Sequence, residues 1–204
     1  MKRVKHFLLA SCLLPAFLGA QGVANASFLE ITPDAQSAGM AGTGLAITDN
    51  GSTAIFHNAS TIAFSQDVMG ASYSYADINK DYGMHSASLF YRIGREGKHG
   101  FTVGFRHYKD ADFHWEDGPK DHARAWNLEA AYFRNIAKNL SVSLTLRYLQ
   151  AKAYKDADSK GSVSMDFGAS YHRSMAILDE MASWTIGFQA ANLGGKLDGQ
   201  KLPA

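Results

Sequence analysis

The chain has 204 residues, with 20 lysines and arginines against 19 aspartates and glutamates, and 46% of its residues are hydrophobic. Because it has no basic excess, its composition gives no reason to expect binding to nucleic acid or to an anionic membrane surface. Its single cysteine, Cys12, lies near the N-terminus, so the rest of the chain has no disulfide and no thiol chemistry.

Residues 1–26 are predicted to be a secretory signal peptide. A basic end precedes an apolar stretch, Phe7–Ala20, and a small-x-small cleavage site, Ala24–Ala26. The apolar stretch is shorter than the roughly 20 residues of a spanning helix, and cleavage after Ala26 is preferred to lipoprotein processing at Cys12. Three basic residues leave with the signal, so the remaining 178 residues carry 17 basic and 19 acidic side chains, a formal charge of −2. They are enough for one domain.

The next segment, residues 27–66, is predicted to pack inside a confined space. Its stretch Phe28–Phe64 has no strong strand pattern but many small residues, which allow close packing of the backbone. The glycine cluster Gly39–Gly44 does not complete a G-x-G-x-x-G fingerprint, so close packing is expected there rather than phosphate binding. The stretch also has too many apolar anchors for a flexible linker. These anchors are Phe28, Leu29, Ile31, Met40, Leu45, Ile47, Ile55 and Phe56.

The same stretch contains a recognisable motif. Its residues are Phe28, Leu29, Ile31, Pro33, Asp34, Ala35, Gly39, Met40, Gly42, Ala46, Asp49 and Asn58. The motif resembles the N-terminal signature of the PorV/PorQ family, outer-membrane barrels akin to the fatty-acid transporter FadL. The chain departs from that signature at Gln36, Ala41 and Ala59-Ser60, where the family has Arg, Gly and Pro-Ala. The resemblance implies a FadL-like barrel in which this segment is a lumenal plug. Its structural residues would be Asp34, Gly39, Met40, Gly42, Asp49 and Asn58.

From Val68 onward, apolar and polar residues alternate, which is typical of strands with one apolar and one polar face. Seven strands are predicted, at 67–77, 82–92, 100–109, 124–134, 140–153, 161–173 and 183–192. All have the roughly 9–11 residues that a tilted membrane-spanning strand needs. Aromatic residues near the strand ends are typical of the interfacial girdles of outer-membrane barrels. The predicted fold class is therefore all-β, an antiparallel transmembrane β-barrel located in the outer membrane.

Residues 67–204 are expected to form about half of such a barrel, the N-terminal half of a protein cut short. Bacterial single-chain barrels close with an even number of strands, and an open edge in hydrocarbon leaves backbone groups unpaired. The longest connection, between the third and fourth strands, is expected to face the cell exterior. The first strand then starts in the periplasm, and Leu193–Ala204 extends outside. The alternative is a complete eight-stranded barrel in which Gly44–Asp49 supplies an extra strand.

Several ionisable residues fall on or near the faces assigned to the lumen. They are Arg106, Glu129, Arg147, Asp166, His85 and His172. They would form either an interior salt-bridge ladder or the lining of a substrate path, and the sequence does not choose between these. The acidic stretch His114–His122 is the most metal-like cluster but lacks ligand spacing, so a charged outer loop is expected. Lys155–Gly161 fails as a calcium loop because Lys160 stands at a ligand position. No metal or cofactor is predicted.

The chain contains no G-x-S-x-G elbow or comparable frame for a hydrolase, so we do not expect an enzyme. The resemblance implies a role in type IX protein secretion, in which the barrel receives or hands over exported cargo at the cell surface. Its partners would be outer-membrane lipid, secretion-system components and exported cargo proteins, not nucleic acid. The alternative is a FadL-like transport channel for small hydrophobic molecules, whose route the apolar residues of Phe28–Phe64 would line.

Overall fold

The computed structural model describes residues 26–79, 82–94, 98–109, 113–114, 120–153, 157–177, 180–197 and 199–202. The predicted signal peptide, except Ala26, lies outside these residues. So do most of His114–His122 and part of Lys155–Gly161. Among the helices of the described part, none is long and apolar enough to cross a membrane.

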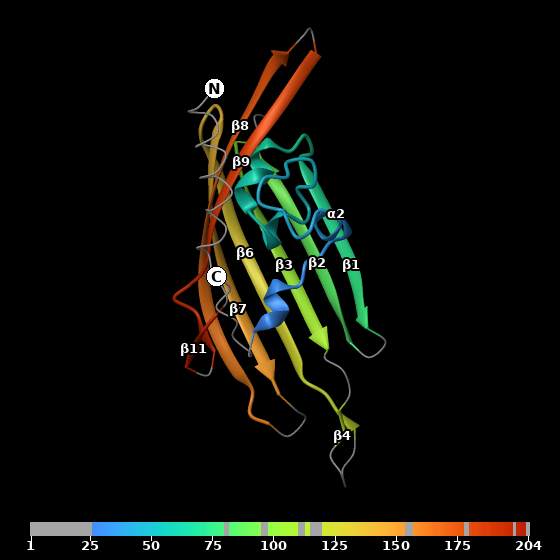
Figure 1. Ribbon diagram of the computed structural model, residues 1–204. Coiled ribbons are helices and arrows are strands. Elements are labelled where there is room, and N and C mark those ends of the chain that lie inside the picture. The colour runs from blue at the N-terminus through green and yellow to red at the C-terminus, as the bar shows by residue number, and fades with distance from the viewer. Residues whose placement is uncertain are drawn as a thin grey trace, which may run out of the picture.

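A curved antiparallel sheet of seven strands dominates the structure (Figure 1). In order across the sheet, its strands are β1 (Met69–Asn79), β2 (Tyr82–Ile93), β3 (His99–Lys109), β6 (Arg124–Ala137), β7 (Leu140–Lys152), β8 (Lys160–Ile177) and β9 (Glu180–Leu193). Each overlaps one predicted range, so the prediction of a partial, antiparallel β-barrel is confirmed. The main difference is that β8 and β9 extend further along their shared hairpin, where cross-strand pairing continues without a clear alternation of polarity.

The strands define two ends of the sheet. The loop end carries the β3–β6 connection, and the turn end carries the tighter β6–β7 and β8–β9 connections. Since neighbouring strands alternate in direction, β1 and β9 both run from the turn end to the loop end, and they are the two edges of the sheet. Gly44–Asp49 forms turns and no strand. The alternative of a closed eight-stranded barrel is therefore wrong for the described chain.

Two short hairpins were not predicted. One, within the β3–β6 connection, pairs β4 (Phe113–His114) with β5 (Lys120–Asp121). The other follows β9 and pairs β10 (Lys196–Leu197) with β11 (Gln200–Lys201).

The second hairpin corrects the expectation for Leu193–Ala204. Its described part does not extend away from the sheet, because Leu197 and Leu202 are buried in an apolar cluster with Phe28 and Leu149. Burying two leucine side chains is worth roughly 1.5–3 kcal/mol each, which favours folding the hairpin back onto the concave face.

Residues 26–65 lie against the concave face of the sheet (Figure 1). They contain four short helices: the 3-10 helix η2 (Ser27–Glu30), the α-helix α2 (Ala35–Gly39), and the 3-10 helices η3 (Ala54–Phe56) and η4 (Ala59–Phe64). Two of them begin at side-chain caps. Asp34 accepts a 2.8 Å hydrogen bond from the amide of Ser37, and Asn58 accepts one of 3.2 Å from the amide of Ser60. Such caps satisfy amides that a helix start leaves without partners.

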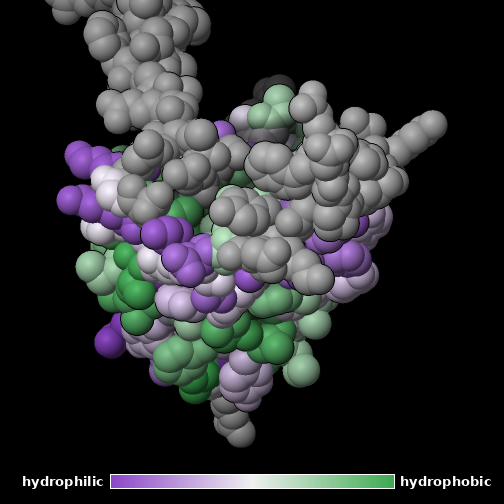
Figure 2. Space-filling model, turned by 90° about the horizontal axis from the view of Figure 1, so that it is seen from below, coloured by the Kyte–Doolittle hydropathy of each residue, from purple (hydrophilic) through white to green (hydrophobic). Residues whose placement is uncertain are grey.

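The two faces of the sheet have opposite polarity. The convex face exposes large apolar side chains, among them Leu89, Phe101, Leu144, Leu146, Ile186 and Phe188. The concave face buries polar ones, among them Ser88, Thr102, Ser143, Thr145, Ser164 and Ser170. Viewed from the loop end, hydrophobic residues gather along one side of the molecule (Figure 2). A water-soluble protein buries its apolar residues instead, whereas a barrel wall in lipid requires this arrangement.

Candidate functional site

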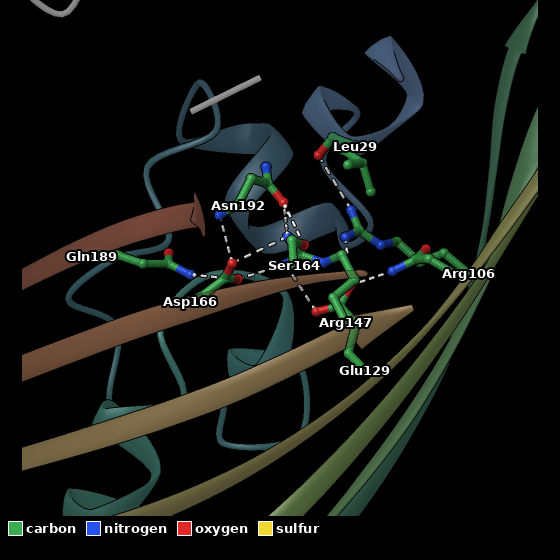
Figure 3. Close-up of polar contacts among 9 residues, drawn as sticks. Leu29, Arg106, Glu129, Arg147, Ser164, Asp166, Gln189 and Asn192 are labelled. Carbon is green, nitrogen blue, oxygen red and sulfur yellow. Dashed lines mark hydrogen bonds and ion pairs between the residues drawn. The ribbon is translucent and has the colours of Figure 1, made fainter. Parts of the chain in front are cut away.

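Four ionisable side chains cross the concave face as a continuous ladder (Figure 3). Arg106 on β3, Glu129 on β6, Arg147 on β7 and Asp166 on β8 are each at most 4% exposed. Nη2 of Arg106 lies 2.5 Å from Oε1 of Glu129. Nη2 of Arg147 lies 3.2 Å from Oε2 of Glu129 and 2.7 Å from Oδ2 of Asp166. Two positive and two negative charges therefore balance one another away from solvent.

The strand register explains why these four residues meet. Glu129 lies directly opposite Arg147, while Arg106 and Asp166 each stand one diagonal step away on the next strand. Because side chains alternate between faces with a period of two, all four project to the same side. Of the two sequence interpretations, the salt-bridge ladder is the one that the contacts support.

Neutral side-chain and backbone groups extend the ladder to β9. Oδ1 of Asp166 accepts a 2.7 Å hydrogen bond from the amide of Asn192, and Oδ2 accepts one of 3.3 Å from Nε2 of Gln189. Arg147 also donates to the side-chain oxygen of Asn192. At the other end, Asn127 donates to Glu129. The sequence analysis did not identify Asn127, Gln189 and Asn192, because their side chains carry no charge.

Arg106 also joins the ladder to the N-terminal segment. Its Nη1 donates a 3.3 Å hydrogen bond to the carbonyl oxygen of Leu29. Its guanidinium carbon lies 5.2 Å from the ring centroid of Phe56, within the range of a cation–π interaction. One buried wall residue thus contacts two parts of the segment, and its position depends on Glu129.

Asn58 is the second attachment between segment and sheet. Its Nδ2 donates to the carbonyl of Leu45 and to the hydroxyl of Ser170, each at 3.0 Å. Two wall glycines leave room for this contact. A Cβ atom at Gly168 would lie 2.3 Å from Oδ1 of Asn58, and one at Gly187 would lie 2.0 Å from the Leu45 carbonyl oxygen. Neither separation is compatible with the packing observed.

Arg92, on β2, is the third attachment and lies toward the turn end. Its guanidinium donates to three backbone carbonyls where the N-terminal segment leads into β1. It bonds Ala63 at 3.4 Å and Asp67 at 3.3 Å, and it also bonds Ser65. An arginine presents five donors in a planar fork, so a single side chain can hold this stretch of backbone.

Asp34, which is buried, and His57, which is partly buried, form a pair within the segment itself. Oδ2 of Asp34 lies 2.7 Å from Nε2 of His57. Burial alone would raise the pKa of the Asp34 carboxyl, but the hydrogen bonds from His57 and the Ser37 amide, with the attraction of His57, outweigh it. The pKa of Asp34 is therefore lower than its ordinary value of 3.8.

The other four residues of the predicted plug motif lie on the exposed side of the segment. They are Gly39, Met40, Gly42 and Asp49. The amide of Gly42 donates to the Ser37 carbonyl at 2.7 Å and closes α2. The preceding Ala41 has φ of 56°, the left-handed conformation that the family's glycine at this place suits better. The structural roles of these four residues remain predictions.

A cavity of about 490 Å³ opens at the turn end. Its lining residues are Thr48, Asp49, Phe64, Ser65, Gln66, Asp67, His172 and Ser183. His172 lies on the concave face as predicted and stacks on Phe64, with 5.2 Å between ring centroids. No group of three or more His, Cys, Asp or Glu among the described residues lies close enough together to hold a metal ion.

The predicted lumenal position of His85 is wrong. This histidine is exposed on the convex face, where its Nδ1 lies 2.8 Å from the hydroxyl of Tyr73 and its ring centroid lies 4.7 Å from that of Tyr75. β2 has large apolar side chains on both faces, Met84 and Phe90 inside and others outside. Alternation therefore did not identify the inner face of this strand.

An apolar convex face, a polar concave face and an N-terminal segment packed on the concave face define the wall of an outer-membrane β-barrel. The family model for the type IX secretion system protein PorV matches residues 20–201. The chain belongs to this family, which confirms the predicted resemblance, and it is an outer-membrane protein involved in type IX secretion. No curated protein and no solved structure matches it.

Proposed function

We propose that this chain forms the wall and plug of a barrel that receives exported cargo, or hands it over, at the cell surface during type IX secretion. The observation that carries this proposal is the attachment of residues 26–65 to the concave face at three points. Arg106 holds the segment near the loop end, and Asn58 and Arg92 hold it toward the turn end. A segment held in this way would seal the lumen against leakage.

If the segment seals the lumen, cargo would be recognised by the connections at the loop end. The β3–β6 connection is the longest between neighbouring strands of the sheet, and long connections of outer-membrane barrels face the cell exterior. The proposed work of the barrel is therefore binding, and no catalytic step is needed.

The FadL-like alternative has less support. It requires apolar residues of the segment to line a free route, but Ile55 and Ile62 are buried against Phe90 and Phe133 of the wall. The wall itself presents mostly serine, threonine and the charged ladder to the concave side. These features favour a packed plug over a path for hydrophobic molecules.

Site-specific photo-crosslinking in secreting cells tests the proposal. A photoreactive residue would replace Ala153, which is exposed at the loop end, or Lys138, which is exposed in the β6–β7 turn as the matched control. We expect exported proteins to be captured from position 153 and not from position 138. Capture from position 138 alone, or none from either position while secretion continues, would contradict the proposal. Hydrophobic small molecules that co-purify with the protein would then favour the transport alternative.

A further inference from the structure

After β9, the chain bends onto the concave face toward the loop end. The point where it bends is fixed to the ladder, because the amide of Asn192 donates a 2.7 Å hydrogen bond to Asp166. Asn192 has φ of 54° and Gly194 has φ of 76°, and backbone in this left-handed region turns the chain sharply. The hairpin β10–β11 follows at once (Figure 1), and the structure describes it at residues 194–197 and 199–202.

The hairpin covers a part of the wall that β9 does not reach. β9 pairs with β8 only as far as Met165, so the first residues of β8 continue beyond it toward the loop end. A Cβ atom at Gly195 would lie 2.8 Å from Cβ of Ser164, and Ser164 is only 2% exposed. Leu197 is buried in one cluster with Leu149 of β7. The hairpin therefore lies over the loop-end part of β7 and β8.

The start of the N-terminal segment is buried in the same place. Phe28 belongs to the apolar cluster of Leu197 and Leu202. Its ring also stacks on Tyr108 of β3, with 6.1 Å between the ring centroids. The nearest polar attachment is Arg106, which bonds the carbonyl oxygen of the residue after Phe28. The hairpin thus helps to hold the part of the segment that comes before this attachment.

The way in which the hairpin is held differs from the three attachments of the segment. Arg106, Asn58 and Arg92 hold the segment by hydrogen bonds. Among the described residues, the hydrogen bonds of the hairpin stay within it or run back to Asn192. Two cross-strand pairs join its strands, and an isolated two-stranded hairpin is marginally stable. At its base, a Cβ atom at Gly194 would meet no atom within 4 Å, so the backbone has room to rotate there.

We propose that residues 194–197 and 199–202 form a lid, hinged at Gly194, that opens and closes over the loop end of the concave face. Burial of two leucines favours the closed form, and the conformational entropy lost by the ordered residues opposes it with a similar order of magnitude. Opening uncovers the apolar cluster and frees Phe28, while the ladder keeps Asn192 in place. This inference does not depend on whether the loop end receives cargo.

Thiol labelling of the full-length protein in detergent measures the opening. Cys12 is the only cysteine of the chain, so Ser164→Cys places a single thiol in the described part, beneath the lid. Ser143→Cys is the matched reporter, because Ser143 is 3% exposed on the same face but is packed near Asn58 of the segment. Peptide mass analysis reads each position. We expect a maleimide to label position 164 through opening of the lid and position 143 far more slowly.

Two variants of the lid should speed the labelling of position 164. For Gly195→Ala we expect roughly 5- to 150-fold, because the added Cβ is too close to the wall and overpacking destabilises the closed lid. For Leu197→Ala we expect roughly 30-fold or more, and this variant covers the case in which Gly195→Ala does not fold. Lys196→Ala is the control, since Lys196 is exposed on the hairpin and its loss should leave the rate unchanged.

Three results would overturn the proposal. One is no labelling at position 164 while the protein stays folded, which would mean that the hairpin does not open. Another is equal acceleration of both reporters in the lid variants, which would mean that the whole segment opens together with the hairpin. The third is an unchanged rate at position 164 in both Gly195→Ala and Leu197→Ala.

Discussion

Glu129 is the residue on which the charge balance of the concave face depends, because it contacts both buried arginines. We expect Glu129→Gln to lower the free energy of unfolding by about 3–5 kcal/mol, since it leaves a buried positive charge without compensation. The measurement is urea unfolding in lipid vesicles, followed by tryptophan fluorescence.

Charge balance can be separated from simple loss of contacts by a second variant. When Glu129→Gln is combined with Arg106→Met, one buried arginine, Arg147, remains beside one buried carboxylate, Asp166. The charges of the ladder are then balanced again. This double variant should recover a large part of the lost stability, although it also removes the contacts of Arg106 with the N-terminal segment. If it is as unstable as the sum of both single variants, the balance of charge is not what matters.

Asp34 links the N-terminal segment to pH. Because its pKa is lower in the folded state than its ordinary value of 3.8, its ionised form stabilises the fold at pH values above that value. This contribution is lost as the pH falls through the lower, folded-state pKa. The difference in unfolding free energy between wild type and Asp34→Asn should therefore shrink between pH 6 and pH 3. A difference that stays constant or grows would show that the carboxylate charge has no part in the contact with His57.

At the scale of elements, η4 and the strands β8 and β9 meet through glycines rather than through complementary side chains. We expect Gly168→Ala and Gly187→Ala to displace Asn58 and Leu45 while leaving the strands paired, because the added Cβ would lie within 2.3 Å of their atoms. Hydrogen–deuterium exchange should rise in peptides covering residues 54–64. The matched control is Gly161→Ala on β8, whose Cβ would face the end of the Tyr148 side chain at 3.2 Å and should leave that exchange unchanged.

The strands could be predicted because each long stretch alternates in polarity, and the four ladder charges could be found because alternation assigns them to one face. Other features could not be read in this way. The 3-10 turns of residues 26–65 have no periodic sequence pattern. The path of this segment along the concave face therefore could not be predicted from the sequence. The register shift between Met165 and Phe167 brings Asn192 to Asp166, and no alternation rule anticipates a shift. His85 was predicted on the wrong face because β2 has apolar residues on both faces.

For the whole molecule, the convex face is expected to respond to an added charge according to the depth of the substituted residue in the membrane. Leu146 is exposed on the convex face near mid-depth, so Leu146→Arg should destabilise the protein in a bilayer by about 2–4 kcal/mol. Gln150→Arg, on the same strand and face but nearer the loop end, where Gln150 pairs with Trp126, should cost only about 0–1 kcal/mol. Unfolding in vesicles measures both, and equal costs would mean that the convex face does not contact hydrocarbon.

The direction of the N-terminal segment has a consequence for biogenesis. Phe28 packs near the loop end, whereas Phe64 lies at the turn end, where β1 then begins. The segment therefore crosses the full height of the concave side before the first strand is laid down. Pulling some 40 residues through a finished wall would require breaking all three attachments and restoring them afterwards. Residues 26–65, which are synthesised before the strands, are better placed as a template, around which the strands assemble in turn from β1 to β9.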